Sequence, residues 1–436
     1  MEPVTPPPVS RARFGAYLYT QFCSAFNDNV HAMAIGLYLA KASGSSETEA
    51  GLWQSVIGAA FVVPFILLSP LAGSLADRYN KRTILILAKW TEILPISVSV
   101  LSTFLPPPAQ YVGFVVGIFL MEVRAAFFSP AKYGILAEIS HPDRLVRSNG
   151  VVQMLTMVGI VSGEAVGGFA LQGLDIRNTM LLCLGVAVVG SLLARFIPPG
   201  APGNPAQRFQ VNPIGGVWGT VREMRLDRVL VVTVFTLSAF WMVSYIFKMN
   251  IPVFGRFALH IGAGQTSLLW AVVSVGIGLG AGLAALLKSS DESMGLVLPG
   301  VAGMAACSVA ASLWARDFAS SAAILGTLGV FGGLYLVPQT SIFQARSPAN
   351  KRGAYLAVQN FANYSFMLLS AGLYALLKKF KLESGQVFLL VGAGLVIVGV
   401  AQTALQPALL LGNSKTLIAR LFGGKPSLDN SKAVSP

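Results

Sequence analysis

Residues 127–150 read FFSPAKYGILAEISHPDRLVRSNG. The charged residues of this stretch, among them Lys132, Glu138 and Arg147, interrupt apolar sequence on both sides. Apolar runs of about 20 residues are long enough to cross a bilayer as helices. The stretch therefore predicts a polar cytoplasmic connection between two membrane helices.

The composition of the whole chain is that of an integral membrane protein. Of 436 residues, 54% are hydrophobic and 11% are charged, and the mean hydropathy is +0.67. Too little polar material remains to cover a soluble surface. The formal net charge of +13 could indicate nucleic-acid binding, but the basic residues lie in short clusters between apolar runs, which indicates membrane topology instead.

Hydropathy predicts an all-α membrane protein with twelve transmembrane helices in two six-helix halves. The predicted spans are residues 14–40, 50–73, 83–105, 109–130, 149–171, 178–197, 228–251, 264–287, 294–314, 319–338, 353–377 and 386–406. The predicted domains are an N-terminal half at 1–197, a cytoplasmic linker at 198–228, a C-terminal half at 229–411 and a cytoplasmic tail at 412–436. Lys and Arg are concentrated in the loops on the side of the termini, so both termini are expected in the cytoplasm.

A weak internal repeat links the two halves. Pro142 precedes Gln153 by the same spacing as Pro348 precedes Gln359, and each glutamine follows a valine. Both intervals contain basic residues and fall in equivalent loops. The two halves are therefore predicted to be parallel repeats.

The sequence GSLADRYNKR at residues 73–82 lies between the second and third predicted helices. It resembles the G-x-L-x-D-x-x-G-R-K/R signature of the major facilitator superfamily, with Asn80 at a position where that family has glycine. Asparagine tolerates a left-handed turn. The resemblance implies the major facilitator fold and a conformational latch made by Gly73, Asp77, Arg78 and Arg82, with Gly73 allowing close approach of helices 2 and 11. The alternative is an ordinary positively charged loop.

Two further pairs of charges lie inside predicted helices. Glu122 and Arg124, near the inner end of the fourth helix, are assigned to the same latch from their depth alone. Lys89 and Glu92 are three residues apart on the third helix, a spacing that allows a local ion pair, and we interpret them as structural.

Two motifs carry a closer resemblance. SPAKYGILAE at residues 129–138, followed by Asn149 and Gly150, and AFNDN at residues 25–29 resemble the bacterial lysophospholipid transporter family within the major facilitator superfamily. The resemblance implies flipping of lysophospholipids, mainly lysophosphatidylethanolamine, from the outer to the inner leaflet of the bacterial inner membrane. It also implies a separate acyltransferase/acyl-carrier-protein synthetase as a partner that reacylates them. We expect a monomer.

Charges inside the membrane are the candidates for binding substrate, because each costs about 2.5–3.5 kcal/mol near the bilayer centre and needs a partner or a cavity. Asp28, flanked by Asn27 and Asn29, is predicted to meet the headgroup ammonium, or else to make a structural hydrogen bond or ion pair. Lys248, on the seventh helix, is predicted to bind the lipid phosphate or to pair with Asp28.

Further candidates have more evenly balanced alternatives. Lys132 either receives the phosphate on the cytoplasmic side or extends toward the membrane surface. Glu164 could line the cavity, carry a proton or pair with another helix. Trp241 and Met242, with Tyr245 and Met249, suit an acyl chain, but such a stripe of Met and aromatic residues is more often typical of helix packing or a lipid-facing surface.

Enzymatic functions find no support in the sequence. It lacks GxSxG, HExxH, GxxxxGK[ST] and CxxC motifs, and no metal or cofactor is indicated. The segment GIGLGAG at residues 276–282 lies inside an apolar helix, where glycines favour close helix packing. The alternative function is a proton-coupled exporter of drugs or other amphiphiles, with Asp28 and Glu164 as proton sites.

Overall fold

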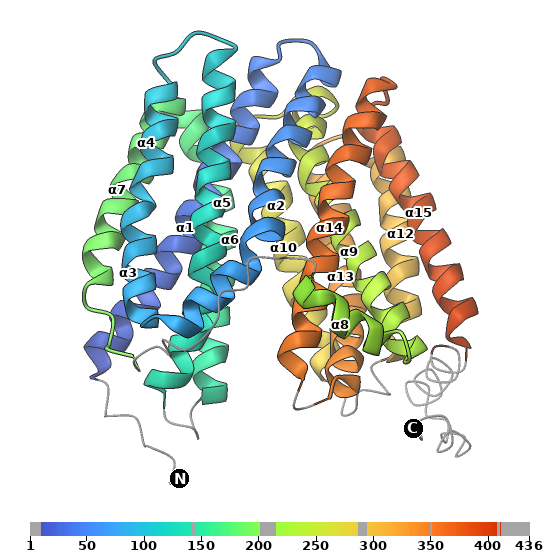
Figure 1. The fold of residues 1–436 in the computed structure, drawn as a ribbon. Coiled ribbons are helices and arrows are strands. Elements are labelled where there is room, and N and C mark those ends of the chain that lie inside the picture. The colour runs from blue at the N-terminus through green and yellow to red at the C-terminus, as the bar shows by residue number, and fades with distance from the viewer. Residues whose placement is uncertain are drawn as a thin grey trace. The chain divides into compact units, whose positions relative to one another are not determined.

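A computed structural model describes residues 10–140, 145–200, 215–286, 294–348, 351–407 and 410, and these residues form helices and connecting turns without a strand (Figure 1). The predicted tail, residues 201–214 of the predicted linker and Pro142 of the repeat lie outside the described residues.

Each predicted span coincides with a helix, and the third is divided in two at Glu92. The helices are α1 (Arg11–Ala42), α2 (Glu47–Arg78), α3 (Lys81–Thr91), α4 (Ile93–Ser102), α5 (Ala109–Ile139), α6 (Leu145–Gly173), α7 (Ile176–Ala194), α8 (Gly215–Met224), α9 (Arg228–Phe257), α10 (Ala263–Ala285), α12 (Val297–Trp314), α13 (Phe318–Arg346), α14 (Arg352–Lys379) and α15 (Ser384–Leu405). The helix α8 in the linker was not predicted. The motif SPAKYGILAE is helical and ends α5, whereas the predicted fourth span stopped at residue 130.

Ten helical segments in the described ranges are long and apolar enough to cross a membrane, with α3 and α4 together forming one of them. The helices α1 and α14 are also long, at 32 and 28 residues, but they fall outside these ten. Both carry polar residues along their middle turns, such as Asn27 and Asp28 on α1 and Asn363 on α14. The all-helical membrane architecture is confirmed, and the total of twelve spans stays a prediction.

The described residues divide into two compact units. Unit 1 contains the described parts of Met1–Gly44, Trp53–Gly216 and Gly262–Ser267, and unit 2 those of Ser45–Leu52, Val217–Ile261 and Leu268–Pro436. In unit 1, α1 packs against α5, α6 and α7, while α4 packs against α5 and α7. In unit 2, α9 packs against α13, α14 and α15, while α12 packs against α13 and α15. The same packing pattern in both units supports the predicted repeat.

Glycines set the closest helix contacts. A Cβ added at Gly163 on α6 would lie 2.3 Å from the carbonyl oxygen of Phe26 on α1, so α6 lies directly against the turn of α1 that carries Asp28. In unit 2, a Cβ at Gly276 on α10 would lie 2.3 Å from the carbonyl oxygen of Gly326 on α13. The close packing predicted for GIGLGAG is therefore confirmed at Gly276.

Candidate functional site

A cluster of charged side chains lies inside unit 1, where α1, α5 and the junction of α3 and α4 meet. Arg124 on α5 forms ion pairs with Asp28 on α1 and with Glu92, the latter at 3.4 Å. Glu92 also accepts hydrogen bonds from Lys89 Nζ at 2.6 Å and from Asn27 Nδ2 at 2.8 Å. We call Asn27, Asp28, Lys89, Glu92 and Arg124 the charge cluster.

The charge cluster is balanced and almost closed to solvent. It contains two carboxylates and two cations, so each buried charge has an opposite charge beside it, as the cost of burying charge requires. The side chains of Lys89 and Glu92 are 0% exposed and that of Arg124 is 2% exposed, whereas Asp28 is 20% exposed. Asp28 is thus the accessible end of the cluster.

Several polar atoms in and beside the cluster have no hydrogen-bond partner among the described residues. They include Nε of Arg124 and Oδ1 of Asn27. On the same helix as Asp28, the side-chain amide of Gln21 and the hydroxyl of Ser24 are also buried without a partner there. Buried polar groups are usually satisfied, so these donors and acceptors mark a place suited to polar ligand atoms or water.

The structure answers part of what the sequence left open for Asp28 and its neighbours. Asp28 makes an interhelical ion pair, one of the two alternatives, and its cation is Arg124. Asn27 donates a hydrogen bond from Nδ2 to Glu92 Oε1. Asn29 is half-buried, and its Nδ2 donates to the carbonyl oxygen of Ala25 on the same helix at 2.8 Å.

The other predicted substrate residues lie on α5, α6 and α9. Lys132 is buried on α5, and its Nζ donates to Thr156 Oγ1 on α6 at 2.8 Å. Glu164 is buried on α6, beside the glycine that packs against α1. Lys248 is half-buried on α9 in unit 2.

The latch residues of GSLADRYNKR have varied surroundings. Asp77 is exposed and Arg78 is half-buried with its guanidinium 6.0 Å from the Tyr79 ring. An added Cβ at Gly73 would meet no atom within 4 Å among the described residues, so nothing described there requires glycine. Arg82 donates from Nε to the carbonyl oxygen of Ile197 at 2.7 Å, which ties the start of α3 to the end of α7.

Asn80 acts differently from the sequence expectation. Its backbone is extended, with φ −60° and ψ 120°, and its side chain caps α3 by accepting from the backbone N–H of Arg82 at 3.0 Å. A short polar side chain at this position satisfies a free N–H of the first turn. Asparagine therefore serves as a helix cap here, and no left-handed turn is made.

Arg124 forms its ion pairs with Asp28 and Glu92 of the charge cluster. Its assignment to the latch with Asp77, which was made from depth alone, stays a prediction. Glu122 is buried on the same helix. The Lys89–Glu92 pair is confirmed, and its contact with Arg124 was missed. Counting the acidic and basic residues within the apolar spans could have linked Arg124 to Asp28 and Glu92, since each buried carboxylate needs a cation.

The sequence also missed an ion pair between its two motifs. Lys81 of GSLADRYNKR reaches Glu138 of SPAKYGILAE at 2.6 Å. Gly134 makes room for the lysine, because an added Cβ there would lie 2.6 Å from Lys81 Cε. The pair joins the start of α3 to the end of α5, so both motifs contribute to one contact in unit 1.

The helical architecture and the sequence define a class of membrane transporters. The family model of the Major Facilitator Superfamily matches residues 17–371, and the chain belongs to that superfamily. Within it, the chain belongs with relatives named lysophospholipid transporter LplT. It is 31% identical to the one from Pectobacterium carotovorum subsp. carotovorum (strain PC1), covering 87% of this chain and 89% of the relative. It is 32% identical to the one from Photorhabdus laumondii subsp. laumondii, covering 84% and 88%.

Solved structures agree on the fold. A bacterial homolog of the human lysosomal transporter Spinster, in an inward-facing and occupied conformation, matches with a TM-score of 0.68 at 15% identity, covering 93% of this chain and 99% of that chain. A D-xylose-proton symporter matches with a TM-score of 0.67 at 15% identity, covering 90% and 96%. At this identity the likeness concerns the fold alone.

Proposed function

We propose that this protein transports lysophospholipids across the bacterial inner membrane and that the charge cluster binds their headgroup. The lipid class follows from the names of its relatives. The headgroup assignment rests on one observation: the Arg124–Asp28 ion pair reaches an accessible position at Asp28, while Nε of Arg124 has no hydrogen-bond partner among the described residues. A free guanidinium donor beside a carboxylate suits a molecule that carries both a phosphate and an ammonium group.

A zwitterionic headgroup exchanges with the existing ion pair. Its phosphate oxygens accept hydrogen bonds from Arg124, and its ammonium group donates to Asp28. Both protein charges gain a new partner as they lose the old one, so no buried charge is left uncompensated. Glu92 retains its contact with Arg124 and keeps the guanidinium in position.

The remaining predicted residues are assigned to the path of the headgroup. Asn27 and Asn29 border Asp28 on α1, and Lys132 and Glu164 lie on the adjoining helices α5 and α6. Lys248 is a cation in the apolar part of α9, which belongs to unit 2 and is the counterpart of α1 in the repeat. We assign Lys248 to binding the phosphate before or after the headgroup occupies the charge cluster.

Transport is proposed to run from the outer to the inner leaflet by alternating access, with lateral access of the lipid and both termini in the cytoplasm. The protein moves lipid without chemical conversion. A separate acyltransferase/acyl-carrier-protein synthetase then reacylates the product, and the latch around Asp77, Arg78 and Arg82 closes the cytoplasmic side. The repeated helix packing of the two units supports alternating access.

The test is leaflet-resolved uptake of labelled lysolipids into proteoliposomes that contain the purified protein. Two substrates are compared, lysophosphatidylethanolamine, which has an ammonium group, and lysophosphatidylglycerol, which has none. The variants are Asp28→Asn and Arg124→Met. Asp317→Asn serves as the matched control, because it makes the same chemical change at an exposed helix cap on α13.

Asp28→Asn is expected to lower uptake of lysophosphatidylethanolamine about tenfold or more, because one charge-assisted hydrogen bond to the ammonium group is lost. Uptake of lysophosphatidylglycerol should fall much less. Arg124→Met is expected to reduce both, because both carry the phosphate. Equal uptake of both lipids by Asp28→Asn and wild type would reject the headgroup site. Absence of flipping by wild type, with proton movement driven by other amphiphiles, would favour the exporter.

A further inference from the structure

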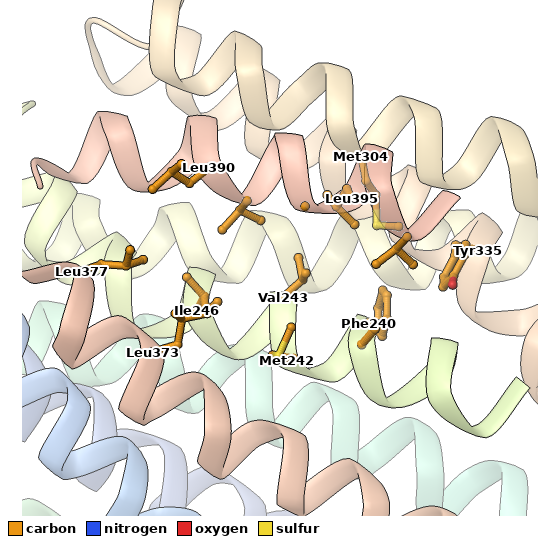
Figure 2. A pocket seen from close by; sticks show the side chains of 14 residues that line it. Phe240, Met242, Val243, Ile246, Met304, Tyr335, Leu373, Leu377, Leu390 and Leu395 are labelled. Atoms are coloured by element: carbon orange, nitrogen blue, oxygen red, sulfur yellow. The ribbon is translucent and has the colours of Figure 1, made fainter. Parts of the chain in front are cut away.

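An apolar cavity of about 300 Å³ lies inside unit 2, between α9 and α15 (Figure 2). Helices α12, α13 and α14 contribute the rest of its wall. The lining side chains are apolar apart from one tyrosine: Ala239, Phe240, Met242, Val243, Ile246, Met304, Tyr335, Leu373, Leu377, Leu390, Val391, Gly394, Leu395 and Val398. The proposed headgroup site does not include this cavity.

The cavity offers almost nothing to a polar ligand. The Tyr335 hydroxyl is the polar group of its lining side chains, and it donates to Gln402 Oε1 at 3.2 Å. None of the lining residues carries a charge. A polar molecule placed here would lose its hydrogen bonds to water without replacement. The occupant must therefore be apolar along its whole buried length.

The cavity is elongated and has one closed end. Phe240, Met304 and Tyr335 lie together at one end, and all three are buried. Leu373 and Leu390 lie toward the other end (Figure 2) and are 37% and 45% exposed. A ligand can therefore enter past these leucines and extend toward the closed end.

The size fits a single hydrocarbon chain. A methylene group takes up about as much space as a water molecule does in the liquid, roughly 30 Å³, so the cavity accommodates about ten methylene groups. We propose that it binds the acyl chain of the transported single-chain lipid. This inference rests on the proposed function and adds a second site to it. Of the four helix-seven residues suited to an acyl chain by sequence, Met242 is the one that lines the cavity.

Photolabelling tests the site in the wild-type protein. Proteoliposomes are illuminated with palmitoyl lysophosphatidylethanolamine that carries a diazirine at the end of its chain, and labelled peptides are identified by mass spectrometry. Label is expected on α9 and α15 around Phe240 and Leu395, and unlabelled lysolipid should compete for it. Label elsewhere would overturn the inference. Equal labelling and competition by a diacyl phosphatidylethanolamine would also overturn it, because the site would then hold ordinary bilayer lipid.

Gly394→Leu tests the consequence of filling the cavity. An added Cβ at Gly394 meets no atom within 4 Å among the described residues, so the leucine side chain can occupy the cavity without displacing backbone. Gly372→Leu is the matched control: Gly372 also has no atom near its added Cβ there, is exposed on α14, and does not line the cavity. Each buried methylene contributes about 0.8 kcal/mol, roughly fourfold in binding.

Gly394→Leu is expected to weaken binding of palmitoyl lysophosphatidylethanolamine at least tenfold and to weaken octanoyl lysophosphatidylethanolamine less, because the shorter chain loses fewer buried methylene groups, whereas Gly372→Leu matches wild type for both. The same chain-length dependence in all three proteins would overturn the acyl site even when wild type flips lysolipid. Failure of wild type to flip any lysolipid would instead overturn the proposed function. If Gly394→Leu fails to fold, the labelled positions in wild type decide.

Discussion

Replacing Lys89 with methionine tests whether the charge cluster is held together by mutual compensation. Lys89 Nζ lies 2.6 Å from Glu92 Oε2, and both side chains are 0% exposed. Removing one partner of a buried ion pair leaves the other charge uncompensated, which costs about 3–5 kcal/mol. Methionine keeps the apolar stem that fills space beside Gly190, so the loss of charge dominates the effect.

The double variant Lys89→Met/Glu92→Gln is expected to recover much of the loss, because both charges are then gone. Lys81→Met is the matched control, the same substitution on the same helix in a pair whose side chains are 17% exposed, where a cost below about 1 kcal/mol is expected. The assay is thermal unfolding of the purified protein in detergent. Lys89→Met should lower the Tm by several degrees and Lys81→Met by much less.

Two results would refute this reasoning. Equal small shifts for Lys89→Met and Lys81→Met would mean that burial adds nothing to the value of the pair. Additive losses in the double variant would mean that Lys89 and Glu92 act independently, contrary to their 2.6 Å contact.

Three other outcomes are expected. Gly163→Ala should reduce the yield of folded protein and lower the Tm, because its Cβ would lie 2.3 Å from a backbone oxygen of α1. Glu47→Gln should lower the Tm more than the double variant Glu47→Gln/Lys378→Met does, because Lys378 is 0% exposed and pairs with Glu47 at 2.9 Å. The hydrogen bond to Glu223 raises the pKa of Lys351. This contact between α8 and the start of α14 therefore persists at neutral pH and is lost as pH rises through the raised pKa of Lys351. NMR titration of Lys351 should show a lower pKa in the Glu223→Gln variant.

The helices could be predicted because hydropathy acts locally. Each apolar run is long enough to span a bilayer, and a backbone in lipid must satisfy its hydrogen bonds within the helix. Helix ends were less predictable. SPAKYGILAE contains Pro130 and charged residues, which suggested a loop, yet Lys81 and Glu138 neutralise each other beside Gly134 and let α5 continue to Ile139.

The charge cluster could be predicted only in part. Asp28 was identified because a lone carboxylate in an apolar helix needs a partner. Its partner Arg124 lies 96 residues away, and that pairing depends on how α1 and α5 pack. The spacing of Lys89 and Glu92 indicated their own pair but not that Glu92 also contacts Arg124. Local spacing gives contacts within a helix, and contacts between helices require the fold.

The repeated architecture carries different chemistry on corresponding helices. In unit 1, α1 contributes Asp28 to a cluster of paired charges. In unit 2, its counterpart α9 contributes Phe240 and Met242 to a cavity without charged lining. A transporter of a uniformly polar solute has no use for the second feature, and a transporter of a uniformly apolar one has no use for the first. An amphiphile with one compact zwitterionic end and one chain requires both, which is why the headgroup variants and the chain-length variants should fail on different lipids.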